Sequence, residues 1–145
     1  MSHHAARALP EPGLVLIVED EEPLAETVSF VVQGAGYTPL VALHGRQALE
    51  LARARRPALL ITDLMLPYLD GAALIAALRA DAAAAGEGAP PSILMTAASL
   101  LDARAAGADV VLRKPFHLAD LEAVLRRFLG PPPPPADAGV STPRG

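Results

Sequence analysis

Short apolar runs alternate with helix-length segments along this chain, and that alternation constrains its fold more than any other feature. The clearest runs are LVLIV at Leu14–Val18, ALLIT at Ala58–Thr62 and SILM at Ser92–Met95. Each run is free of charged residues and short, as expected of strands buried inside a sheet. Strands that alternate with helices favour a parallel sheet with right-handed crossovers and helices on both faces. We therefore predict a doubly wound α/β fold.

The other elements follow from helical periodicity and from helix-stop and turn signals. Pro23 suits the first turn of a helix, because its missing amide hydrogen is not needed there. Pro39 places the second strand at a sheet edge. The predicted strands are 14–18, 37–41, 58–62, 92–95 and 109–112, and the predicted helices are 23–34, 45–56, 72–85, 100–106 and 117–129.

Length and composition indicate one domain with extensions at both ends. Of the 145 residues, we predict a disordered lead-in over 1–12, a domain over 13–130 and a proline-rich disordered tail over 131–145. The chain is 52% hydrophobic but 3% aromatic, so the core must be aliphatic. A net charge of −4 argues against direct nucleic-acid binding. With no cysteine, no membrane-spanning run and no signal-peptide pattern, we expect a cytoplasmic protein that does not bind membranes.

Polar side chains gather where the predicted strands end. Glu19 and Asp20 follow the first strand, Asp63 the third, Thr96 the fourth and Lys114 the fifth. The carboxyl ends of parallel strands share one edge, where ligands bind in open α/β sheets. Three acids would repel one another there unless a cation neutralised them, and Mg²⁺ suits one or two carboxylates together with phosphate and water. The pattern predicts a phosphoryl-transfer site with Asp63 as the nucleophile.

These motifs, in this order and on these strand ends, resemble the receiver domains of two-component response regulators, the CheY-like superfamily. The resemblance covers Gly13–Gly130. It implies a flavodoxin-like five-stranded sheet in the order 2-1-3-4-5. It also implies that a sensor histidine kinase or a His-phosphotransfer protein phosphorylates Asp63, and that the phosphorylated state changes the binding of a downstream protein.

The resemblance further implies a role for each site residue, with Mg²⁺ as the cofactor. Mg²⁺ would be held by Asp20 and Asp63, by Glu19 through water and by the backbone carbonyl of Met65. The phosphoryl group would bond to the Thr96 hydroxyl, the Ala97 amide and Lys114, and the Lys114–Pro115 peptide bond would be cis. The domain would catalyse its own phosphotransfer and dephosphorylation, as a monomer or weak dimer.

Three features depart from the usual receiver pattern. Val111 replaces an aromatic residue three positions before the lysine, and the segment from Thr96 to Lys114 is about one helical turn short. His117 begins the last helix, where Asp or Ser is more usual. We expect the first two departures to move the output away from the face around Val111, towards the loop 97–102 or the first helix.

Other readings of the same residues remain open. A Mg²⁺-dependent aspartyl-phosphate phosphohydrolase would need an acid two residues after the nucleophile, where this chain has Met65. A binding-only pseudo-receiver is disfavoured by the complete set of site residues. No output domain fits in the tail, so the chain is a stand-alone receiver or a piece of a larger protein, and the start at Met1 favours the former. We interpret His44 as a cap or loop residue, Arg55–Arg56 as a solvated helix end and Asp70–Gly71 as a turn.

Overall fold

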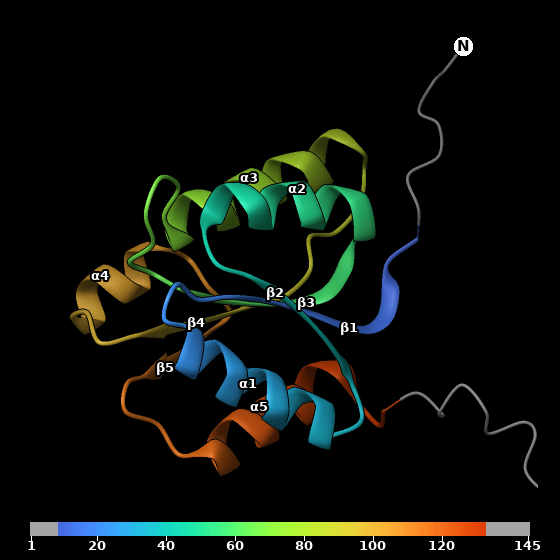
Figure 1. Cartoon of the computed structure of the whole chain (residues 1–145). Coiled ribbons are helices and arrows are strands. Elements are labelled where there is room, and N and C mark those ends of the chain that lie inside the picture. Colours follow the sequence, from blue (N-terminus) through green and yellow to red (C-terminus); the bar gives the residue numbers. More distant parts are fainter. Residues whose placement is uncertain (1–8, 133–145) are drawn as a thin grey trace, which may run out of the picture.

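The computed structural model describes residues 9–132, which form five parallel strands in the order β2-β1-β3-β4-β5 with helices between them (Figure 1). This confirms the predicted fold class and strand order. The elements are β1 Glu11–Val18, α1 Glu22–Gly34, β2 Thr38–Ala42, α2 Gly45–Arg55, β3 Pro57–Asp63, α3 Gly71–Ala84, β4 Ser92–Thr96, α4 Leu100–Ala105, β5 Val110–Arg113 and α5 Leu118–Leu129.

The lead-in predicted to end at residue 12 is shorter than expected. Glu11 and Pro12 belong to β1, and the Glu11 amide donates a 2.9 Å hydrogen bond to the Arg56 carbonyl. The ladder with β3 is irregular between Glu11 and Val15, where Gly13 has a φ of 73°. The first strand residues lack the apolar pattern of the rest of β1 and were therefore not predicted as strand. The predicted disorder of 1–8 and 133–145 falls outside the described residues.

The core consists of two mainly aliphatic layers on opposite faces of the sheet, and one of them also contains the buried Tyr37. Helices α1 and α5 cover one face, and α2 and α3 cover the other (Figure 1). Alternate residues of β1 point to different layers, as the period of a strand requires: Val15 and Ile17 pack with α1 and α5, whereas Leu16 and Val18 pack with α2 and α3. An aliphatic core was predicted from the scarcity of aromatic residues.

Strand register brings the carboxyl ends of β1, β3, β4 and β5 to one level. Val18 pairs with Thr62, Asp63 pairs with Met95, and Thr96 pairs with Arg113. The residues at or just beyond these ends are the ones that the sequence singled out. The sheet therefore places Glu19, Asp63, Thr96 and Lys114 along one edge.

The segment between β4 and β5 is short, as its length in the sequence indicated. Helix α4 has six residues, and the Ser99 side chain accepts a hydrogen bond from the Asp102 amide at its start. The Lys114–Pro115 peptide bond is cis, as the family resemblance implied. Across residues 9–132, no helix has both the length and the apolar character that a membrane crossing requires.

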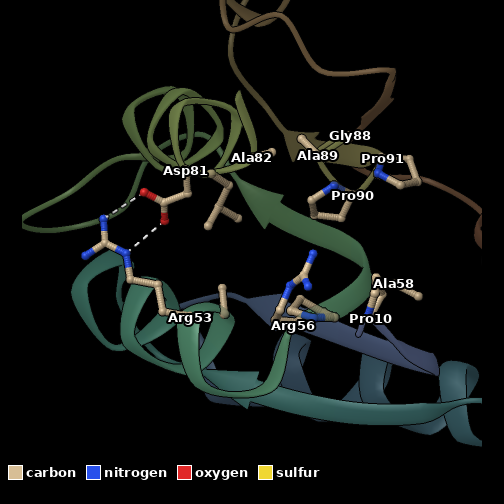
Figure 2. A pocket seen from close by; sticks show the side chains of 13 residues that line it. Pro10, Arg53, Arg56, Ala58, Asp81, Ala82, Gly88, Ala89, Pro90 and Pro91 are labelled. Carbon is tan, nitrogen blue, oxygen red and sulfur yellow. Dashed lines mark hydrogen bonds and ion pairs between the residues drawn. The ribbon is translucent and has the colours of Figure 1, made fainter. Parts of the chain in front are cut away.

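The opposite edge of the sheet holds a cavity of about 260 Å³ between α2, α3 and the loop before β4 (Figure 2). Arg53 closes one side by donating two hydrogen bonds to Asp81, with Nε–Oδ2 2.9 Å and Nη2–Oδ1 3.2 Å. Arg56 also lines this cavity and forms an ion pair with Glu87. The charges at this edge are therefore paired between neighbouring elements.

Arg56 corrects the interpretation of Arg55–Arg56 as a solvated helix end. Arg56 is only 8% exposed, whereas Arg55 is solvated and pairs with Glu11. Arg56 ends α2 in the left-handed region, with a φ of 52°, and its amide bonds to the Ala52 carbonyl. This turn leads the chain directly into β3, and the Arg56 side chain lines the cavity, where an ion pair with Glu87 offsets part of its desolvation.

Candidate functional site

Three carboxylates converge at the carboxyl ends of β1 and β3. One oxygen each from Glu19, Asp20 and Asp63 lies within 4.8 Å of the others. Glu19 and Asp63 are buried at the strand ends, whereas Asp20 is exposed at the start of the loop before α1. The cluster is thus open to solvent on the Asp20 side, and a small ion could enter from there.

Lys114 reaches this cluster from the loop after β5. Its Nζ lies 2.6 Å from Asp63 Oδ2 and 3.1 Å from Glu19 Oε1. Three carboxylates face one ammonium group, so the ionised cluster keeps an excess of negative charge. A divalent cation with oxygen ligands is the species that this donor set fits.

Burial affects the two charged partners differently. Burial raises the pKa of Glu19, and the nearby Asp63 charge adds to this effect, while hydrogen bonds from the Glu21 amide and Lys114 only partly oppose it. Burial alone would lower the pKa of Lys114, but its hydrogen bonds to Asp63 and Glu19 outweigh burial and raise that pKa. Lys114 therefore stays a cation, whereas ionised Glu19 carries an energetic cost in the metal-free protein.

The loop between β3 and α3 is built tightly around Asp63. The Met65 amide donates a 3.1 Å hydrogen bond to Asp63 Oδ1, and the Gly71 amide donates a 2.9 Å bond to the Leu64 carbonyl. A Cβ atom on Gly71 would lie 2.2 Å from the Asp63 carbonyl oxygen, so only glycine fits there. Asp70 caps α3 by accepting a bond from the Ala73 amide. The Asp70–Gly71 pair was predicted as a turn; its close packing against the site was missed.

The remaining predicted site residues lie at the same edge with local partners. Thr96 is buried, and its Oγ1 accepts a 2.9 Å hydrogen bond from the Ala98 amide. Ala97 is exposed in the loop that follows, and Met65 is 70% exposed next to Asp63. The structure thus brings Glu19, Asp20, Asp63 and Lys114 together, while the roles of Thr96, Ala97 and Met65 remain predictions.

Sequence reasoning did not single out Tyr68, which lies in the same loop. Its backbone is left-handed, with a φ of 69°, and its side chain is 84% exposed. Its ring meets the His44 ring edge to face, with centroids 5.7 Å apart and planes at 80°. His44 caps α2, as one reading proposed: its Nδ1 accepts a 3.2 Å bond from the Gln47 amide. Nothing in the pattern around Tyr68 signalled a backbone conformation that normally favours glycine.

Comparison with known proteins defines the class of this domain. The family described as "Response regulator receiver domain" matches residues 15–126. The chain therefore belongs to the response regulator receiver domain family, and it is a receiver domain of two-component signalling.

Individual relatives agree with this assignment. The DNA-binding response regulator MtrA of Mycobacterium tuberculosis is 36% identical over 119 residues, which are 79% of this chain and 50% of MtrA. The chain spans about half the length of the curated relatives that it matches.

Solved receiver domains share the fold. The signal receiver domain of a signal transduction histidine kinase from Syntrophus aciditrophicus is 31% identical, with a TM-score of 0.72, over 81% of this chain and 89% of that chain. The receiver domain of a sensor histidine kinase from Pseudomonas aeruginosa, solved with a magnesium ion coordinated in the active site cleft, is 28% identical. Its TM-score is 0.71 over 83% of this chain and 99% of that chain.

Proposed function

We propose that Asp63 accepts a phosphoryl group from a phosphohistidine of a sensor kinase or His-phosphotransfer protein, with Mg²⁺ bound at the acidic cluster. The observation that carries this proposal is the convergence of the carboxylates of Glu19, Asp20 and Asp63 within 4.8 Å, beside Lys114. A nucleophilic carboxylate, a cation site and a lysine are the parts that phosphoryl transfer needs, because the reaction depends mainly on positioning and charge neutralisation.

The donor set supports Mg²⁺ as the cofactor. Asp20 and Asp63 would bind it directly, Glu19 would bind through water, and the Met65 carbonyl would complete the protein ligands. Mg²⁺ prefers oxygen ligands and keeps several waters, which suits a site with one exposed side. The magnesium ion in the Pseudomonas aeruginosa receiver domain supports the same assignment by similarity.

The proposed reaction moves one phosphoryl group between two proteins. An Asp63 carboxylate oxygen attacks phosphorus, the bond from phosphorus to the donor imidazole nitrogen breaks, and an acyl phosphate forms. Lys114 neutralises charge on the transferred group, and the Thr96 hydroxyl and Ala97 amide donate hydrogen bonds to its oxygens. Hydrolysis of the acyl phosphate by water returns the domain to its starting state.

The proposal includes the setting in which this chemistry operates. The domain would act in the cytoplasm as a monomer or weak dimer, without direct contact to nucleic acid or membrane, and the phosphorylated form would bind a downstream protein differently. A phosphohydrolase reading is disfavoured, because Met65 occupies the position two residues after Asp63 with an exposed thioether and no acid.

The test is the intact mass of the protein after incubation with Mg²⁺ and acetyl phosphate. We expect the wild type and the control Asp81→Asn, whose substitution lies at the opposite edge, to gain one phosphoryl group, and Asp63→Asn to gain none. Equal phosphorylation of Asp63→Asn and wild type would show that the acceptor lies elsewhere. A folded wild type that binds Mg²⁺ but is never phosphorylated would favour a binding-only role.

A further inference from the structure

Tyr68 combines a strained backbone with an exposed aromatic ring. The Leu69 amide donates a 2.8 Å hydrogen bond to the Pro67 carbonyl, so Tyr68 is the central residue of a γ-turn with positive φ, a rare and strained conformation. The side chain is 84% exposed and adds little to the core. Glycine would adopt this turn without strain. A tyrosine here is therefore poorly explained by folding alone, and such outliers tend to gather at functional sites.

The contact that the Tyr68 ring does make is with His44 at the start of α2. The His44 ring is itself held in place, because its Nδ1 accepts the capping hydrogen bond from Gln47. One residue further along each segment, Gly45 lies so close to the Leu69 carbonyl oxygen that a Cβ atom would be 2.0 Å away. The tip of the β3–α3 loop thus rests on the start of α2 through two adjacent contacts.

The other parts of this loop connect its tip to the acidic site. The bond between the Gly71 amide and the Leu64 carbonyl closes the loop at its base, and the Met65 amide bonds to the Asp63 carboxylate. Asp70 and Gly71 are fixed by the start of α3. A shift of the loop tip at Tyr68 must therefore be absorbed mainly by the segment 65–67, which includes the proposed carbonyl ligand.

We propose that Tyr68 and His44 are positioning residues for the metal site. Their edge-to-face contact holds the β3–α3 loop in the geometry in which the Met65 carbonyl and the Asp63 carboxylate bind Mg²⁺ together. This inference rests on the proposed function, because it concerns the same metal site. The positioning role belongs to the aromatic ring of Tyr68 and not to its backbone conformation.

The test measures Mg²⁺ affinity by following the backbone amide resonances of residues 63–65 of the full chain during titration with MgCl₂. Tyr68→Phe keeps the ring, so wild-type affinity is expected. Tyr68→Gly relieves the backbone strain but removes the ring, and His44→Asn keeps a good helix cap but removes the other ring. Each of these two variants should bind Mg²⁺ about two- to tenfold more weakly, the range that an aromatic pair can contribute.

The double variant with both changes separates a shared contact from two independent effects. If both rings act through one shared contact, the double variant should bind Mg²⁺ no more weakly than the single variant with the lower Mg²⁺ affinity. Because glycine suits this turn and asparagine suits this cap, the melting temperatures of the metal-free variants should stay near that of the wild type. If a variant instead bound Mg²⁺ weakly because its fold was less stable, its metal-free melting temperature would fall below that of the wild type.

Two results would overturn the inference while leaving the proposed function intact. One is wild-type Mg²⁺ affinity in both Tyr68→Gly and His44→Asn, and the other is fully additive losses in the double variant. Failure of the wild type itself to bind Mg²⁺ would instead count against the proposed function, and the positioning role would fall with it.

Discussion

The two edges of the sheet both bury charged side chains, but they balance those charges in different ways. At the amino-terminal edge, Arg53 pairs with Asp81 and Arg56 pairs with Glu87. At the carboxyl-terminal edge, the three carboxylates of Glu19, Asp20 and Asp63 lie together, and Lys114 pairs with two of them, Glu19 and Asp63.

This difference indicates what each edge does. The paired charges link elements of the fold: Arg53 joins α2 to α3, and Arg56 joins the end of α2 to the loop before β4. The acidic edge keeps an excess of negative charge when it is ionised, so a cation bound there would stabilise that edge in particular. Structural and functional charges can therefore be distinguished by local balance, and burial alone does not separate them.

The largest expected effect is stabilisation by Mg²⁺ at the acidic edge. A ligand that binds only the folded state at a hundredfold excess over its Kd adds about 2.7 kcal/mol to the free energy of unfolding. We expect thermal melts of the wild type to rise with Mg²⁺, and Asp20→Ala to lose most of that rise. Asp81→Ala removes an acid from the amino-terminal edge instead, and this variant should keep the full rise in melting temperature with Mg²⁺. If Asp20→Ala keeps the full rise in melting temperature with Mg²⁺, then an excess of negative charge does not identify the metal site.

A somewhat smaller effect is expected at the balanced edge. Arg56→Ala removes a partly buried ion pair with Glu87 and the packing of the Arg56 side chain, which should lower the free energy of unfolding by about 1–3 kcal/mol. Arg55→Ala is the matched control, because its exposed pair with Glu11 should contribute at most about 1 kcal/mol. Urea unfolding measures both. Equal stability of the two variants, or a lost Mg²⁺ response in Arg56→Ala, would contradict the division of roles between the edges.

Most of the fold could be predicted from the sequence, because local pattern and global topology agree. The apolar runs of β1, β3 and β4 are buried strands except for half-buried Ala58, and Pro39 lies in the edge strand β2, where a missing amide hydrogen is tolerated. The first residues of β1 were missed because Glu11, Pro12 and Gly13 do not continue its apolar run. Helix ends differ from the predicted ones by at most one residue, since hydrogen bonds and not sequence periodicity decide them.

The acidic site was predictable for a related reason: in a parallel sheet, residues that follow successive strands must meet at one edge. Arg56 and Tyr68 were not predictable in this way. Both have left-handed backbones, and neither is a glycine, the residue that normally indicates such a conformation. The burial of Arg56 and the exposure of Tyr68 both follow from these turns. Local sequence is least informative where a residue other than glycine adopts a left-handed backbone.

The smallest expected effect concerns Glu19, the one fully buried acid of the site. Because burial raises its pKa, the folded protein binds a proton at Glu19 more tightly than the unfolded chain does, so ionised Glu19 destabilises the metal-free fold above that pKa. Glu19→Gln mimics the protonated acid. It should therefore melt higher than the wild type at neutral pH without Mg²⁺, on the order of a few degrees. The gap should narrow as the pH falls through the raised pKa, because wild-type Glu19 then becomes protonated.

With Mg²⁺ present, the wild type should melt higher than Glu19→Gln, because the wild type gains more stability from the metal than the variant does. Glu26→Gln, an exposed change on α1, is the control and should match the wild type at every pH. Melting temperatures measured from pH 4 to pH 8, with and without Mg²⁺, give all of these comparisons. If Glu19→Gln melts lower than the wild type in metal-free buffer at neutral pH, then Glu19 stabilises the fold through its bonds to Lys114 and Glu21, and the acidic edge is balanced after all.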